Sequence, residues 1–150
     1  MLIVIIAFNN LEIHQMNIKT AFLNIDLDEN IYIKQHEESK IPGQERKVCK
    51  FVKSLYGLKQ APKLWHEKFD NLMLSNGFNI NKCVYVKNIN TTYVIVCLYI
   101  DDMLIFGSNT NIIKTTKQML TNKFDMKNIG VADVILGMKI SKTYDGLILY

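Results

Sequence analysis

The sequence contains few cysteines, the residues that form disulfides and bind structural zinc. Its three cysteines, Cys49, Cys83 and Cys97, are odd in number and show no paired metal-ligand spacing. That pattern argues against a disulfide framework or a structural zinc site, and it favours reduced thiols that pack in an ordinary core. Only two prolines and seven glycines are present, and we find no flexible linker, internal repeat or low-complexity tract.

Long hydrophobic runs are missing as well. The strongest apolar segments are interrupted by Asn9 and Asn10 or by Asp101 and Asp102, which leaves them far short of the roughly 20 residues that span a bilayer. Residues 1–8 are apolar, but they have no basic lead-in and no small-residue cleavage site of the kind that marks a signal peptide. We expect residues 1–8 to form a buried helix turn or strand, and we expect no membrane partner.

What is present is the composition of a globular domain. The chain is 49% hydrophobic and 21% charged, and its 150 residues are enough for one domain with a real core, which we take to be residues 1–150. The formal net charge of +4 is compatible with a polyanionic partner and equally with a solvated basic surface. Because the chain begins and ends in apolar, regular sequence, we expect a domain truncated at both ends.

Residues 93–106 hold the most informative pattern, two apolar runs on either side of Asp101 and Asp102. Each run is rich in β-branched and aromatic residues, which favours buried strands, and aspartate suits the turn between them. We therefore predict a β-hairpin that lifts both carboxylates to the edge of an apolar sheet. Two carboxylates about 5 Å apart repel by roughly 3 kcal/mol at an effective dielectric near 20, a cost that Mg²⁺ would remove. The alternative is a solvated turn in which the acids merely avoid burial.

The rest of the chain alternates short strands with two amphipathic helices. Apolar residues recur at helical spacing from Trp65 to Met73, with Pro62 suited to the first turn and Gly77 to the end. A second helix is expected to begin with Thr110 as its cap. Strands are expected at residues 12–18, 31–34, 48–52, 84–86 and 134–140, and hairpin turns at residues 88–92 and 144–147.

Basic residues gather between positions 40 and 68 and are interleaved with Phe51, Tyr56 and Trp65. Basic and aromatic side chains together suit contact with a nucleic-acid backbone and its bases. A merely solvated face explains the same pattern. The basic residues are Lys40, Arg46, Lys47, Lys50, Lys53, Lys59, Lys63 and Lys68.

Four ordered segments are similar to those of one family. Residues 15–24 read QMNIKTAFLN, residues 54–62 read SLYGLKQAP, residues 99–103 read YIDDM and residues 124–130 read FDMKNIG. Together they resemble the reverse transcriptase of Ty1/copia-type LTR retrotransposons, which is part of a Pol polyprotein. The resemblance covers nearly the whole chain.

This resemblance implies an α+β fold, a polymerase palm with part of the fingers, in which an antiparallel sheet packs on helices. It implies an RNA-directed DNA polymerase, a nucleotidyltransferase that uses two Mg²⁺ (or Mn²⁺) ions to join the primer 3′-hydroxyl to the α-phosphate of a dNTP. The partners would be an RNA/DNA template-primer and the dNTP. The location would be intracellular, in the cytoplasm or in a virus-like particle, and the oligomeric state is left open.

The resemblance also assigns roles to individual residues. Asp101 and Asp102 match two of the family's three catalytic, metal-binding aspartates, and Asn17 stands at the third position. Ala21 and Phe22 fall where the family lines the incoming sugar, with Phe22 as the steric barrier to a 2′-hydroxyl. The loop that meets the template and the nucleotide supplies Gly57, Lys59 and Gln60.

Asn17 is the departure from the family pattern with the largest consequence. An amide oxygen can touch Mg²⁺, but it brings no charge to a site that must hold two dications. We expect the Asn17 side chain within a few ångströms of the Asp101 carboxylate, facing the same cleft as Phe22. Ile25, in place of a glycine, is a further departure, so we expect an eroded fragment with impaired catalysis. The alternatives are a nucleic-acid-binding relic without chemistry and another palm-type nucleotidyltransferase, for which residues 54–62 have no explanation.

Overall fold

The computed structural model describes residues 9, 11–132, 134–135, 138–143 and 146–149. The expectation of a buried helix turn or strand over residues 1–8 lies outside the described residues. The chain forms two compact units, one made of residues 20–68 and the other of residues 1–19 and 69–150. No helix among the described residues is long and apolar enough to cross a membrane.

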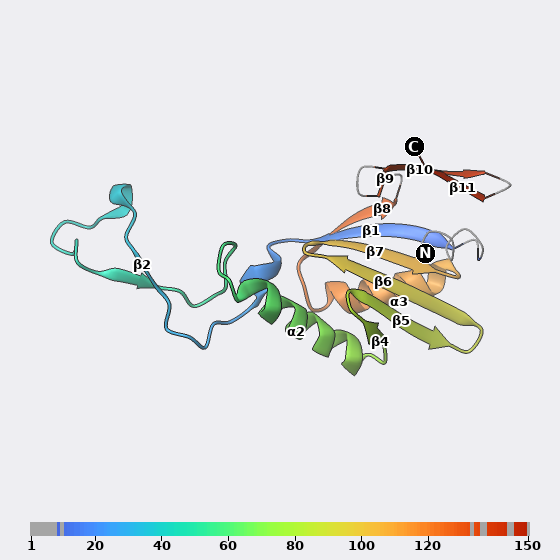
Figure 1. The fold of residues 1–150 in the computed structure, drawn as a ribbon, viewed down its shortest axis with the longest axis horizontal. Helices are drawn as coiled ribbons and strands as arrows, with labels where there is room; N and C mark the ends of the chain where they lie inside the picture. Colours follow the sequence, from blue (N-terminus) through green and yellow to red (C-terminus); the bar gives the residue numbers. More distant parts are fainter. Residues whose placement is uncertain (1–8, 10, 133, 136–137, 144–145, 150) are drawn as a thin grey trace. The chain divides into compact units, whose positions relative to one another are not determined.

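The larger unit is built on a six-stranded antiparallel sheet with the order β4-β5-β6-β7-β1-β8 (Figure 1). Two-residue turns join β5 to β6 and β6 to β7, so the predicted hairpins at residues 88–92 and 93–106 are confirmed. The strands are β1 (Glu12–Ile18), β4 (Asn79–Asn81), β5 (Val84–Ile89), β6 (Thr92–Tyr99), β7 (Asp102–Gly107) and β8 (Met126–Val131), and the helices are α2 (Ala61–Ser75) and α3 (Thr110–Thr121).

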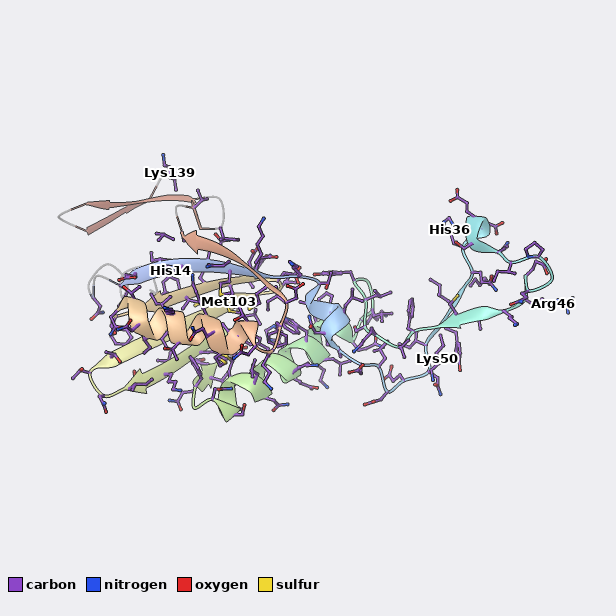
Figure 2. The ribbon with its side chains drawn as sticks, turned by 180° about the vertical axis from the view of Figure 1, so that it is seen from behind. His14, His36, Arg46, Lys50, Met103 and Lys139 are labelled. Atoms are coloured by element: carbon purple, nitrogen blue, oxygen red, sulfur yellow. The ribbon has the colours of Figure 1, made fainter. Side chains whose placement is uncertain are left out.

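One face of this sheet packs against the helices. Figure 2 shows α3 covering the face on which His14 and Met103 lie, and Lys117 of α3 reaches His14. The ring of Phe69 on α2 stands edge-on to Tyr85 of β5, with ring centroids 5.1 Å apart. Met103 and Tyr85 are fully buried, so this face holds the main core of the unit, as expected for helices with one apolar stripe.

The opposite face carries a smaller apolar cluster and, at one end, the predicted site. Side chains alternate between faces along a strand, so Asn17 shares its face with Ile13, and Asp102 shares its face with Phe106. The cluster lies where β1, β6 and β7 run side by side, and Ile13, Ile95 and Phe106 are buried in it. Its buried members are Leu11, Ile13, Ile95, Phe106 and Ala132.

Helix α2 ends as the sequence predicts. Gly77 has a φ of 78°, a left-handed conformation that glycine adopts without a steric penalty. Its amide donates to the carbonyl of Leu74 at 2.9 Å, and the amide of Phe78 donates to the carbonyl of Met73 at 3.1 Å. This pair of bonds is the Schellman motif, which satisfies carbonyls that the last turn leaves free.

Helix α3 begins one residue away from the expected cap. The side chain of Asn109, not that of Thr110, caps the helix, because Asn109 Oδ1 accepts the amide of Ile112 at 3.1 Å. The Thr110 hydroxyl donates instead to Glu12 Oε1 at 2.9 Å. Both residue types are good caps, and the competing contact with β1 takes Thr110 out of that role.

A separate three-stranded sheet follows β8, with the order β11-β10-β9. The single strand predicted over residues 134–140 was wrong, because residues 134–135 and residues 138–140 belong to two strands that pair in antiparallel fashion, with Met138 opposite Ile135. The pairing of Thr143 with Gly146 confirms the hairpin predicted at residues 144–147, although residues 136–137 and 144–145 lie outside the described part. The strands are β9 (Val134–Ile135), β10 (Met138–Thr143) and β11 (Gly146–Leu149).

The unit of residues 20–68 is mostly irregular and contains a two-stranded ribbon of β2 and β3. All six residues of these strands are exposed, and both strands are shorter than the predicted 31–34 and 48–52. The elements are the 3₁₀ turns η1 (Ala21–Asn24) and η2 (Glu37–Ser39), β2 (Tyr32–Lys34), β3 (Val48–Lys50) and the first part of α2.

The cysteines are free thiols, but the expectation that they pack in the core was wrong for two of them. Cys49 and Cys83 are exposed, whereas Cys97 is partly buried. Cys49 lies on the exposed ribbon, and Cys83 lies in the tight connection between β4 and β5. Burial raises the pKa of the Cys97 thiol to about 11, so this thiol is protonated at neutral pH.

Candidate active site

Strands β6 and β7 place the two aspartates at a two-residue turn. Tyr99 pairs with Asp102, so Ile100 and Asp101 form the turn and Asp102 is the first residue of β7. Ile100 has a φ of 57°, which costs a β-branched residue about 1–3 kcal/mol. A positive φ at the first turn residue is typical of the type II′ turn, whose twist matches that of the flanking strands. Strain of this kind is concentrated at functional sites.

Strand β1 brings residue 17 to the same edge of the sheet. Asn17 lies opposite Asp102, and its Nδ2 donates a hydrogen bond to Asp102 Oδ1 at 3.1 Å. The backbone amide of Ile18 donates to the carbonyl of Asp101 at 2.8 Å. The backbone bond ties the turn to β1, and the side-chain bond ties the first residue of β7 to it.

The structure brings the Asn17 side chain to Asp102 and places the backbone of Asp101 in the adjacent turn. The Asn17 amino group donates to the side chain of Asp102, whereas the predicted neighbour was the carboxylate of Asp101. The reason is that antiparallel pairing places residue 17 opposite the first residue of β7 and not opposite the turn. Phe22 belongs to the other unit, so its position relative to this edge stays a prediction.

The donor set at this edge fits a hard divalent cation in part. Asp101 and Asp102 offer carboxylate oxygens, the ligands that Mg²⁺ prefers. Asn17 can offer only a neutral amide oxygen, and its amino group is bonded to one oxygen of Asp102. Within the described part of the chain, no group of three or more His, Cys, Asp or Glu side chains is placed to share a metal ion.

Four residues form a row across strands β6, β7, β1 and β8 at this end of the sheet. Tyr99 pairs with Asp102, Asp102 with Asn17, and Asn17 with Lys127 of β8. Directly opposed residues of antiparallel strands point to the same face. The row therefore presents an aromatic ring, a carboxylate, an amide and an ammonium group on the face opposite the helices.

The sequence motifs assign no role to Lys127, which lies within residues 124–130. Its partner on β1 could not be counted from the sequence, because the register between β1 and β8 shifts between Gln15 and Met16. A β-bulge of this kind adds a residue to one strand and changes which side chains are opposed.

In the other unit, Ala21 and Phe22 are buried in η1. The Phe22 ring packs against the ring of Tyr56, with centroids 4.4 Å apart and an interplanar angle of 57°. Tyr56 precedes Gly57 in the loop that leads to α2. Phe22 is thus held in place by an aromatic neighbour within its own unit.

The predicted template-binding loop is a series of turns. Gly57 has a φ of 95°, and the amides of Leu58 and Ala61 donate to the carbonyls of Leu55 and Leu58. Lys59 is exposed on this loop. Two side chains fix its end, because Gln60 Nε2 donates to Glu29 Oε2 at 3.0 Å.

A second polar cluster lies under α3. Lys117 Nζ contacts His14 Nδ1 at 2.9 Å and donates to Asn128 Oδ1 at 2.8 Å, while His14 Nε2 lies 3.6 Å from Glu12 Oε2. Burial, followed by the Lys117 charge, holds the pKa of His14 below its ordinary value. Burial likewise lowers the pKa of Lys117. These contacts join α3 to β1 and β8.

The comparisons with known proteins agree with the motifs. Residues 1–150 match the family model described as reverse transcriptase (RNA-dependent DNA polymerase). The chain is 47% identical over 135 residues to the retrovirus-related Pol polyprotein from transposon TNT 1-94 of Nicotiana tabacum, covering 87% of this chain and 10% of the relative. It is 33% identical to the putative transposon Ty5-1 protein of Saccharomyces cerevisiae, covering 87% of this chain and 44% of the relative.

A third relative is the retrovirus-related Pol polyprotein from transposon RE1 of Arabidopsis thaliana, 30% identical over 90% of this chain and 9% of the relative. The chain thus spans from about a tenth to less than half of the length of these curated relatives. No solved structure is significantly similar to it. The chain belongs to the reverse transcriptase (RNA-dependent DNA polymerase) family, and its relatives are copia-type Pol polyproteins of plant and yeast transposons.

Proposed function

We propose that this chain is the palm segment, with part of the fingers, of an RNA-directed DNA polymerase, and that Asn17 leaves it catalytically impaired. The observation that carries the proposal is the hydrogen bond of 3.1 Å from Asn17 to Asp102 at the hairpin turn. It sits in a chain that belongs to the reverse transcriptase family. In this proposal Asn17 takes the place of a third metal ligand but contributes no negative charge.

In this proposal Asp101 and Asp102 hold Mg²⁺ or Mn²⁺. When bound, such ions activate the primer 3′-hydroxyl and stabilise the leaving pyrophosphate. A carboxylate at position 17 would repel Asp102 and make a cation favourable there, because like charges in contact cost several kcal/mol at an effective dielectric near 20. The Asn17 amino group instead donates a hydrogen bond to Asp102 Oδ1, so this oxygen has a partner without a cation. The site thus loses both a ligand and part of the reason to bind metal.

The residues of the other unit take the substrate roles of the proposal. Phe22, held by Tyr56, and Ala21 line the sugar of the incoming dNTP. The loop of Gly57, Lys59 and Gln60 contacts the template strand and the nucleotide. Its turns and the bond from Gln60 to Glu29 support a loop of defined shape, and the exposed Lys59 ammonium suits a phosphate.

Primer extension tests this proposal. The chain, Asp102→Asn and Asn17→Asp are compared on a poly(rA) template with an oligo(dT) primer and Mg²⁺ or Mn²⁺. We expect the unmodified chain to incorporate no more dTTP than Asp102→Asn, because the chain already lacks one of the three carboxylates at position 17 and removal of a second has no activity left to abolish. Processive synthesis by the unmodified chain would contradict the claim of impairment. Asn17→Asp need not restore synthesis, since the chain spans only part of its relatives.

A second candidate function is nucleic-acid binding without chemistry. The observation that favours it is the exposed ribbon of β2 and β3, in which Tyr32 lies opposite Lys50. Figure 2 shows His36, Arg46 and Lys50 along the same segment. An exposed aromatic ring beside an ammonium group provides a stacking surface and a phosphate contact together.

A mobility-shift assay with an RNA–DNA duplex tests this candidate. Binding should weaken steeply as salt rises from 50 to 200 mM, because phosphate contacts release counterions. Tyr32→Ala should weaken binding by about 1–3 kcal/mol if a base stacks on the ring. Tyr99→Ala removes an exposed aromatic ring from the other unit and so measures the contribution of that unit to binding. Absence of a shift even at the lowest salt would eliminate this candidate.

A further inference from the structure

We propose that Lys127 and Asn17 together form a metal-independent contact for the phosphodiester backbone of a nucleic-acid strand. The proposal rests on the proposed function in one respect, namely that the face carrying the row from Tyr99 to Lys127 is turned toward nucleic acid. It adds a binding residue that the motifs do not assign. It also gives Asn17 a role that differs from that of an inadequate metal ligand.

The position of Lys127 is determined by two independent contacts. Lys127 lies opposite Asn17 across β1 and β8. Its neighbour Asn128 accepts a hydrogen bond from Lys117 of α3, so Asn128 is on the face that the helix covers. Because successive residues of a strand alternate between faces, Lys127 points to the opposite face, which is the face of Asp102.

The charge of Lys127 is uncompensated within the described part of the chain. Its side chain is exposed, and it makes no ion pair or hydrogen bond with any described residue. The nearest acid in the sequence is Asp125, which precedes β8 and whose carboxylate is bound by Lys19 at 3.1 Å. An exposed ammonium group with three free donors is available for an anionic partner.

Asn17 adds a second donor beside this ammonium group. Directly opposed residues have Cβ atoms about 4.5–5.5 Å apart, so the two side chains can reach one phosphate group. The Asn17 amino group has two hydrogens, and the bond to Asp102 uses one of them. With aspartate at position 17, the same place would repel a phosphate, whereas the amide attracts one.

The distance to the carboxylates separates this contact from the metal site. Lys127 is two strands away from Asp102, which corresponds to roughly 10 Å at a strand spacing of about 4.8 Å. If the 3′ end of a nucleic-acid strand lies at Asp102, a phosphate a few nucleotides upstream of that end would therefore lie over Lys127. Neither Lys127 nor Asn17 needs a cation for this contact, so it is expected to persist in EDTA.

The test measures binding of a fluorescently labelled RNA–DNA duplex by anisotropy between 50 and 200 mM salt, in EDTA and in Mg²⁺. Lys127→Met is compared with Lys114→Met, which removes the same charge from an exposed position on α3. We expect Lys127→Met to weaken binding by about fivefold or more and to lower the salt slope by about 1, equally in both buffers. Lys114→Met should leave the slope unchanged. Asn17→Asp should weaken binding in EDTA.

Equal effects of Lys127→Met and Lys114→Met would overturn this inference and leave the polymerase proposal intact. Lys127→Arg keeps the charge and should keep most of the affinity; if it binds as poorly as Lys127→Met, the phosphate contact is also refuted. No binding of the duplex by the unmodified chain at 50 mM salt would overturn the inference as well. Conversely, failure of the metal-site assignment would not alter the difference between Lys127→Met and Lys114→Met.

Discussion

Gly107 holds the strand of the candidate site against helix α3, and Gly107→Ala is expected to destabilise the chain. Gly107 is buried at the end of β7. A Cβ atom built there would lie 2.4 Å from Ile113 Cγ1, 3.0 Å from Ile113 Cδ1 and 3.1 Å from Ile112 Cγ2. Optimal carbon contacts are about 3.5–4.0 Å, so one methyl group overlaps Ile113 by more than about 1 Å.

The magnitude follows from how little Ile113 can move. Its side chain is 1% exposed, and Cγ1 is close to the helix backbone, so relief requires a shift of α3 or an unfavourable rotamer. Overpacking of this kind costs about 1–3 kcal/mol. The φ of Gly107 lies outside the left-handed region, so backbone strain does not contribute to this cost.

Urea unfolding followed by circular dichroism measures the effect in a double-mutant cycle. Ile113→Ala alone should cost about 2–5 kcal/mol, because it empties a buried position. In the double variant Gly107→Ala with Ile113→Ala the new methyl group has room. We therefore expect the two costs to fall short of additivity by about 1 kcal/mol or more.

Two results would refute this reasoning. A loss of stability below about 0.5 kcal/mol in Gly107→Ala, the range of ordinary surface substitutions, would contradict the packing described for α3. Strict additivity in the cycle with Ile113→Ala would show that the cost of Gly107→Ala arises away from this contact.

Three further predictions concern other parts of the larger unit. Asn109→Ala should cost about 1 kcal/mol by removing the cap of α3, and Asn111→Ala should cost less; equal costs in urea unfolding would disprove the cap. Because burial and Lys117 hold the pKa of His14 below 6.5, stability should be highest above that pH and fall as the pH drops through it, and Lys117→Met should reduce this loss; parallel pH profiles would argue against the contact. Ile100→Gly should raise the free energy of unfolding by about 1 kcal/mol through release of strain, and a loss of stability would count against the strained turn.

Features carried by local patterns could be predicted from the sequence. The hairpin around Asp101, the helix ending at Gly77 and the strand containing Asn17 depend on periodicity and turn residues within a few positions of each other. The choice between Asn109 and Thr110 as the helix cap could not be made, because both residue types cap well and the deciding contact is with Glu12.

Features that depend on strand pairing between distant segments could not be predicted from the sequence. Asn17 and Asp102 are 85 positions apart, and only the insertion of β1 between β7 and β8 makes them neighbours. The alignment of Lys127 with Asn17 depends further on the register shift between β1 and β8. A shift of one residue in such a register moves every side chain to the other face.

The most direct test of the account is the Mn²⁺ affinity of Asn17→Asp, measured by calorimetry beside Asn128→Asp. Both substitutions add one carboxylate to the same sheet, but residue 17 is opposite Asp102 and residue 128 is bonded to Lys117 on the helix face. We expect Asn17→Asp to bind Mn²⁺ at least about tenfold more tightly than the unmodified chain, a gain of about 1.4 kcal/mol, and we expect no such gain in Asn128→Asp. An unchanged affinity in Asn17→Asp, or an equal gain in Asn128→Asp, would contradict the assignment of residue 17 to a metal site with Asp101 and Asp102.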